Sequence, residues 1–100
     1  MDTSHEPSVL AGMPPFDWDN DRAVRYEVAQ EAICQAVAAY TVLINQAAEQ
    51  GDATREAQLT EARTACVDER IGLSSADAAA LDAVVSRYRA RIAELRAQAA

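Results

Sequence analysis

The longest uninterrupted part of this chain is the stretch from Arg22 to Gln50, which contains no Gly and no Pro and has an apolar side chain at nearly every helical turn. The positions that recur in it at alternating spacings of three and four residues are Tyr26, Gln30, Ile33, Val37, Tyr40, Ile44 and Ala47. This spacing is typical of the buried face of a helix and not of a strand. At about 1.5 Å per residue the helix would be roughly 43 Å long, so we expect the rest of the chain to lie along it.

A second row of side chains flanks the first and widens the apolar surface of this helix. Its members are mostly small: Ala29, Ala32, Ala36, Ala39 and Leu43. We therefore expect the helix to contact more than one neighbour at close approach. Because much of the hydrophobic content of these 100 residues is Ala and only 5% are aromatic, the core should be thin. A partner, or a second copy of the chain, should add stability.

Two glycines divide the rest of the chain into helices. Gly51 suits the left-handed position that ends a helix, and Asp52 offers the next N-cap, so the chain should reverse there as a helical hairpin. Gly72 should end the second helix, and Ser74 with Asp77 resembles a capping box at the start of a third.

The predicted fold is therefore all-α, an antiparallel three-helix bundle with a long first helix. The predicted helices span residues 20–50, 53–71 and 75–97, and Asp19 or Asn20 should cap the first of them. The inner faces of the second and third helices should be formed by Leu59, Ala62, Cys66, Leu73, Leu81, Val85, Tyr88, Ile92 and Leu95. An extended acidic tail should precede this domain, over residues 1–19.

The tail contains all three prolines and the only His, and its charged residues are all acidic. Its last part places the only Phe and the only Trp of the chain, Phe16 and Trp18, beside Asp17 and Asp19. Aromatic residues are scarce in disordered segments, and Trp is favoured at the centre of interfaces. The two rings therefore either contact the chain's own helices or dock on another protein.

The formal charge of −7, with no Lys, argues against nucleic-acid binding, because that affinity depends on cationic side chains that neutralise phosphates. A helix-turn-helix arrangement is also disfavoured, since recognition helices contact bases through N-terminal residues, which are Ala and Asp in the last helix. The one basic patch comprises Arg87, Arg89, Arg91 and Arg96. It is either a solvated face that pairs with acidic neighbours on the first two helices or a surface that meets a partner's carboxylates.

The N-terminus lacks a basic region followed by an apolar run, and no apolar stretch has the roughly 18 residues of a membrane span. We therefore expect no membrane association and a cytoplasmic location. In that reducing compartment Cys34 and Cys66 should be free thiols. The hairpin would place them nearly level, so a disulfide between them stays an alternative.

Catalysis needs a nucleophile with a base, paired carboxylates in a cleft, or a set of metal ligands. His5 lies in the tail, and Ser74 and Ser75 are explained by capping. Glu27 and Glu31 share a helical face, but di-metal bundles also use a Glu-x-x-His pair, and no predicted helix contains a His. Since a Gly-rich phosphate loop is also missing from the sequence, we expect no enzyme, no cofactor and no metal site.

Two segments carry a resemblance to a known family. One is Tyr26-Glu27-Val28, near the start of the long helix. The other is Leu73-Ser74-Ser75-Ala76-Asp77 at the start of the last helix, followed by Ala80-Leu81-Asp82-Ala83-Val84 and then by Tyr88-Arg89. In these segments and in the order of its helices, the chain resembles the small three-helix epsilon antitoxins of epsilon/zeta toxin-antitoxin pairs.

The resemblance implies a non-enzymatic protein that binds a P-loop kinase toxin and obstructs its nucleotide site with the first part of the long helix. It carries over to Tyr26, Glu27 and Glu31. Because the segment before this helix is longer than in the family, the tail is a second candidate for blocking, and its candidate partner-binding residues are Phe16, Asp17, Trp18 and Asp19. The expected partner is a toxic enzyme in a hetero-oligomer. The alternative is a self-associating helical scaffold or adaptor, for example a homodimer.

Overall fold

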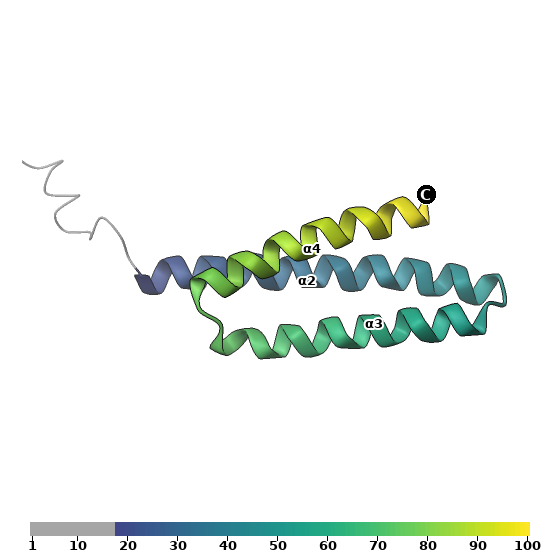
Figure 1. The fold of residues 1–100 in the computed structure, drawn as a ribbon, viewed down its shortest axis with the longest axis horizontal. Helices are drawn as coiled ribbons and strands as arrows, with labels where there is room; N and C mark the ends of the chain where they lie inside the picture. Colours follow the sequence, from purple (N-terminus) through teal and green to yellow (C-terminus); the bar gives the residue numbers. More distant parts are fainter. Residues whose placement is uncertain (1–17) are drawn as a thin grey trace, which may run out of the picture.

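The computed structural model describes residues 18–100, which form three α-helices and one short 3-10 helix. The elements are α2 (Trp18–Glu49), α3 (Ala53–Gly72), η1 (Leu73–Ser75) and α4 (Ala78–Ala99). Figure 1 shows α3 running antiparallel to α2, and α4 returning parallel to it. No strand occurs in residues 18–100, so the predicted all-α three-helix fold is confirmed. The prediction for residues 1–17 lies outside the described residues.

The first helix begins earlier than predicted. Trp18 and Asp19, which the sequence analysis assigns to the tail, belong to the first turn of α2, so neither Asp19 nor Asn20 is its cap. Instead, Asp21 accepts a hydrogen bond from Arg25 Nε one turn later, at 2.7 Å. Acidic side chains near a helix N-terminus and pairs one turn apart both stabilise a helix, so these residues favour helix over an extended tail.

The turn between α2 and α3 matches the prediction, whereas the turn before α4 does not. Gly51 has a φ of +71°, and Asp52 Oδ1 accepts from the Arg55 backbone amide at 3.0 Å. At the second turn Gly72 stays right-handed, with a φ of −72°, and the chain continues into η1. Asp77 is then the N-cap of α4, accepting from the Ala80 amide at 2.8 Å.

The central element is α2, and α3 and α4 pack along two sides of it (Figure 1). Both rows predicted on this helix contribute to the core, which contains Ala29, Ala32, Ile33, Ala36, Tyr40, Leu43, Ile44 and Ala47 of α2. The other elements add Leu59, Cys66, Leu73, Leu81, Val84, Tyr88, Ile92 and Leu95. Five residues predicted for the seam or the inner faces are only half-buried: Tyr26, Gln30, Val37, Ala62 and Val85. On α4, Val84 is buried instead of its neighbour Val85.

Long side chains join α3 to α4 at a cluster that we call the α3–α4 junction, formed by Glu69, Arg87 and Tyr88. The Tyr88 side chain is only 1% exposed and donates its hydroxyl to Glu69 Oε1 at 2.7 Å. Arg87 donates to both carboxylate oxygens of Glu69. These bonds to Arg87 hold the pKa of the Glu69 carboxyl below its usual range, and burial raises the pKa of the Tyr88 hydroxyl. For Arg87, pairing with an acidic neighbour on the second helix is confirmed.

Both cysteines are free thiols, as predicted; Cys66 is buried and Cys34 is half-buried. Each sulfur accepts a hydrogen bond from an arginine: Arg70 Nη1 donates to Cys34 Sγ at 3.4 Å, and Arg91 Nη1 donates to Cys66 Sγ at 3.7 Å. Arg63 likewise joins α3 to α2, donating to the Thr41 hydroxyl at 3.0 Å.

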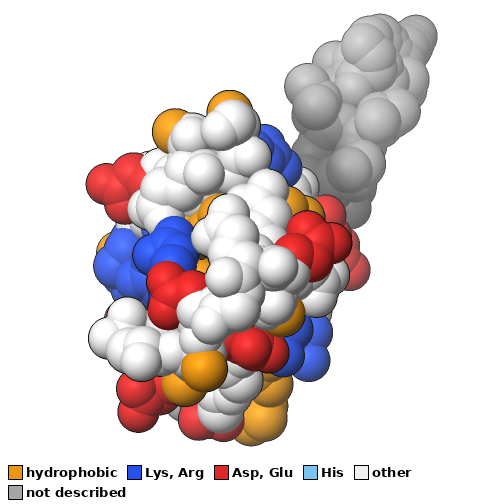
Figure 2. Space-filling model, turned by 90° about the vertical axis from the view of Figure 1, so that its right-hand side faces the viewer, with side chains coloured by type: hydrophobic (Ala, Val, Ile, Leu, Met, Phe, Trp, Pro, Cys, Tyr) orange, Lys and Arg blue, Asp and Glu red, His pale blue; other side chains and the backbone are white. Residues whose placement is uncertain are grey.

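The end of the bundle at which α2 turns into α3 carries charges of both signs. Figure 2 shows acidic and basic side chains interspersed there, with apolar side chains between them. None of the described helices combines the length and the apolar character needed to cross a membrane.

Candidate functional site

A hollow of the surface runs along the seam between α2 and α4, and no residue of α3 lines it. We call it the α2–α4 groove. Its α2 side includes Val24, Glu27, Val28, Glu31, Gln35 and Val42. Its α4 side includes Arg89, Ile92 and Arg96. The central part has a volume of about 430 Å³, and the groove continues beyond it toward both ends of α4.

The groove exists because α4 covers only one row of apolar residues on α2. Two contacts set the register of the parallel helices: Arg25 pairs with Asp82 near the start of α4, and Gln46 Nε2 donates to the Ala99 carbonyl oxygen at 3.2 Å near its end. In this register the Ala-rich row is buried, except for Ala39, which is half-buried. The next row stays open, and its valines are 49% (Val24), 40% (Val28) and 48% (Val42) exposed. Val24 and Val28 are one turn apart and form a small exposed apolar patch, and contiguous exposed apolar patches occur at interaction surfaces.

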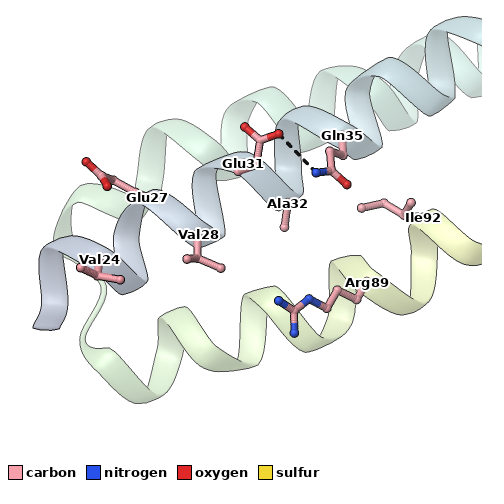
Figure 3. A pocket seen from close by; sticks show the side chains of 8 residues that line it. All are labelled: Val24, Glu27, Val28, Glu31, Ala32, Gln35, Arg89 and Ile92. Atoms are coloured by element: carbon pink, nitrogen blue, oxygen red, sulfur yellow. Dashed lines mark hydrogen bonds between the residues drawn. The ribbon is translucent and has the colours of Figure 1, made fainter.

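The groove has an apolar floor between two sides of opposite charge (Figure 3). Val28 and Ala32 point from α2 toward α4, and Ile92 points back toward α2. Glu27 and Glu31 project from the α2 side, away from α4, whereas Arg89 extends from the α4 side.

Arg25 and Asp82 pair with each other at one end of this groove, but its central charged groups are less engaged. Glu31 accepts a hydrogen bond from Gln35 Nε2 at 3.2 Å. Among the residues whose side chains the structure describes, neither Glu27 nor Arg89 forms an ion pair. Such side chains keep their full capacity to bind an opposite charge on another molecule.

The structure brings two of the predicted partner-binding residues together and separates a third. Glu27 and Glu31 are both exposed and line the same part of the groove. Tyr26 is half-buried against the core, where its hydroxyl accepts from Gln30 Nε2 at 3.1 Å. The Arg22 guanidinium lies over its ring, 5.7 Å from the centroid. Tyr26 thus holds the first turns of α2 and does not line the groove.

The side chains of the four predicted tail residues are not described by the structure, so their position relative to the groove is not part of the site. Phe16 and Asp17 lie outside the described residues. Trp18 and Asp19 are in the first turn of α2, and the structure describes their backbone only.

The first turns of α2 are tied to the turn before α4. Arg22 Nε and Nη2 donate to the Ala76 carbonyl oxygen at 3.1 and 2.9 Å, and Nη2 also donates to the Ser74 carbonyl oxygen at 2.9 Å. The ion pair between Arg25 and Asp82 is a second connection between the two helices. The groove end that contains Glu27 is therefore held in a fixed shape before any partner binds, which lowers the ordering cost of binding.

Two features of the groove were not predicted from the sequence: the exposed valines and the division of the basic patch. The available signal for the valines was that Val24 and Val28 are one turn apart on the helical face that also carries Glu27. In the structure Arg87 and Arg91 are engaged with α3, since Arg91 Nη1 donates to Cys66 Sγ at 3.7 Å. The other two arginines of the patch, Arg89 and Arg96, line the α2–α4 groove.

The groove is suited to binding a protein segment. Its apolar floor can take apolar side chains, and its two charged sides can orient a segment that has complementary charge. Within residues 18–100 no cluster of His, Cys, Asp and Glu has the arrangement of a metal site. Comparison of the chain with protein-family models, with curated proteins and with solved structures gives no match.

Proposed function

We propose that this chain is a non-enzymatic inhibitor that binds a partner enzyme through the acidic side of the α2–α4 groove and obstructs the nucleotide site of that enzyme. The observation that carries the proposal is the pair Glu27 and Glu31, which are exposed one turn apart on α2 and line one hollow with the open valines Val24 and Val28. Of this pair, Glu27 is engaged by no other described side chain.

The chemistry of a nucleotide site explains why carboxylates fit it. Such a site holds phosphates with Lys, Arg and backbone amides at a helix N-terminus, and the same groups bind carboxylates through short, charge-assisted hydrogen bonds. The two valines supply apolar contact beside these bonds. The resemblance to the epsilon antitoxins supports the same mode of binding, since it assigns the blocking role to the first part of the long helix. A P-loop kinase toxin of the cytoplasm is therefore the partner class that we propose.

The test is rescue of growth. The proposal requires a toxic enzyme encoded beside the gene of this chain, and its absence would refute the proposal. The chain is co-expressed with that enzyme, and the variant Glu27→Arg/Glu31→Arg is compared with wild type. Wild type should restore growth and the variant should not, because two arginines would face the cationic groups of the nucleotide site. With purified proteins, the charge reversal should slow association most at low ionic strength, where steering between charges is least screened.

The matched control reverses two exposed carboxylates outside the groove, Glu61 of α3 and Glu94 of α4. Glu61→Arg/Glu94→Arg changes the net charge by the same amount and should rescue as well as wild type. Full rescue by Glu27→Arg/Glu31→Arg, with unchanged association rates, would refute the proposed binding site.

A further inference from the structure

The arginines of the α2–α4 groove differ from those at the other two seams of the bundle. Between α2 and α3, Arg70 donates to the sulfur of a cysteine. Between α3 and α4, Arg87 pairs with Glu69. In the groove, by contrast, Arg89 and Arg96 form no ion pair with another side chain of residues 20–100. The α4 side of the groove therefore keeps two cations available to an acidic ligand.

The chain itself contains an uncharged and largely apolar segment close to this groove in sequence. Residues 7–16 read Pro-Ser-Val-Leu-Ala-Gly-Met-Pro-Pro-Phe and are preceded by Glu6. They lie outside the described residues, but α2 begins at Trp18, and Val24 lines the groove within two helical turns of that point. Because apolar side chains gain free energy when they leave water, such a segment favours a nearby apolar surface.

The segment is long enough to reach along the groove. From Trp18 to Ala39, which lines the groove beside Arg96, the distance along α2 is about 32 Å. An extended chain covers about 40 Å from Glu6 to Trp18. The difference of about 8 Å leaves room for the reversal of direction at the start of α2. A segment that folds back antiparallel to α2 therefore brings Glu6 to the level of Arg96.

In this register the charges of the segment match those of the groove. The uncharged residues 7–16 pass the carboxylates of Glu27 and Glu31, and the first acidic side chain, Glu6, meets Arg96. The three prolines of the segment also suit a groove between helices. Helix backbone groups are already paired and offer few partners, and a proline has no amide hydrogen that must lose its water.

We propose that residues 7–16 of this chain fold back and occupy the α2–α4 groove, with Glu6 beside Arg96. The segment would cover Val28 and Val42, which are 40% and 48% exposed in the described part of the chain. It would thereby extend a core that contains many alanines.

The docked segment has a consequence that rests on the proposed inhibitor function. It lies over the hollow that Glu27 and Glu31 line, so a partner enzyme must displace it before these carboxylates are reached. The segment is then an internal competitor of the enzyme. Variants that release it should bind the enzyme more tightly than wild type does, since they avoid the cost of displacement.

The first experiment is limited proteolysis of the purified full chain with thermolysin, which cleaves before large apolar residues such as Leu10. Mass spectrometry follows cleavage at this bond. A docked segment is cleaved only when it leaves the groove, so the rate reports the undocked fraction. Val28→Gln/Val42→Gln leaves the segment unchanged and should raise the rate about threefold, because it removes apolar contacts of the groove.

The control for this variant is Ile71→Gln. It alters a residue that is 68% exposed near the end of α3 and outside the groove, and it should be cleaved before Leu10 at the wild-type rate. Circular dichroism of both variants checks that the helices are intact, so that faster cleavage reports release of the segment and not unfolding of the bundle.

The second experiment exchanges charges. Arg96→Glu alone and Glu6→Arg alone should each raise the cleavage rate about twofold, which is the size of effect expected for one exposed ion pair. Glu6→Arg/Arg96→Glu should return the rate to nearly that of wild type, because opposite charges again face each other. A nonspecific apolar contact would not show this recovery.

Three results would overturn the docking: a valine variant that is cleaved no faster than wild type, a charge exchange that fails to recover, or a wild-type rate that falls as the protein concentration rises, which would assign the cover to a second copy. The variant Arg96→Glu separates the two proposals, because it releases the segment and leaves Glu27 and Glu31 in place. It should still rescue growth. Loss of rescue by every form of the chain would refute the inhibitor function without changing the cleavage rates.

Discussion

The central helix α2 has two rows of residues with similar helical spacing, and the bundle treats them differently. The covered row, which includes Ile33 and Tyr40, is enclosed by α3 and α4. The groove row, which includes Val24, Val28 and Val42, is left between 40% and 49% exposed. The groove row has Glu31 and Gln35 between Val28 and Val42, so its apolar spacing is interrupted, whereas that of the covered row is continuous. Within residues 18–100 the chain covers the continuous row and leaves the interrupted row open.

The difference between the rows lies in what closes each one. The α3–α4 junction links the two helices that pack over the covered row. In it the buried Tyr88 donates its hydroxyl to Glu69, so the polar end of this large side chain has a partner. On the groove side, no further helix of residues 18–100 covers α2. Apolar and charged side chains stand together there, as they do at protein interfaces.

The largest effect should come from a cavity in the covered row. Ile33 is fully buried, so Ile33→Ala should lower the free energy of unfolding by roughly 2–5 kcal/mol. For a thin core this is a large part of total stability. Urea denaturation followed by circular dichroism measures the change. If Ile33→Ala unfolded at the same urea concentration as wild type, the covered row would contribute no more to stability than the groove row does.

A smaller effect should come from the α3–α4 junction. Glu69→Gln should lower the free energy of unfolding by roughly 1–2 kcal/mol at neutral pH, because it weakens charge-assisted bonds to a partly exposed pair. The exposed Glu61 of the same helix provides the control, and Glu61→Gln should change stability by less than about 0.5 kcal/mol. Thermal melts of the three proteins at neutral pH compare them directly.

The same carboxylate gives the junction a pH dependence. Arg87 holds the pKa of Glu69 below its ordinary value of 4.5, so the unfolded chain takes up this proton at a higher pH than the folded chain. The stabilisation is therefore complete above pH 4.5 and is lost as the pH falls through the lowered pKa. Wild type and Glu69→Gln should converge in stability in strong acid. A constant difference between them down to pH 2 would show that the charge of Glu69 contributes nothing.

The fold could be predicted from the sequence because its signals are local. Helical spacing and the Gly51-Asp52 step act within a few residues, and the structure follows them. The start of α4 was missed because Ser74 and Asp77 are both good caps, and the choice between them depends on burying Leu73 in η1, where it is 3% exposed. That burial depends on packing between residues far apart in sequence.

The candidate site was predicted only in part for the same reason. Glu27 and Glu31 are one turn apart, so local spacing was enough to group them. Tyr26 is adjacent to Glu27 in sequence, yet it faces the core, because a step of one residue turns a side chain about 100° around a helix. Arg89 enters the groove only through the register of α4 on α2, which depends on contacts such as that between Arg25 and Asp82.

The smallest effect on stability should come from the groove row. Val28→Ala and Val28→Gln should change the free energy of unfolding by no more than about 0.5 kcal/mol, because Ala and Gln are good helix formers and Val28 is exposed. Ile33→Ala, on the same helix, is the comparison for this result, and urea denaturation measures all three variants. If Val28→Gln destabilised the chain as much as Ile33→Ala does, the groove row would belong to the core, and its exposure could not be used to argue for a partner.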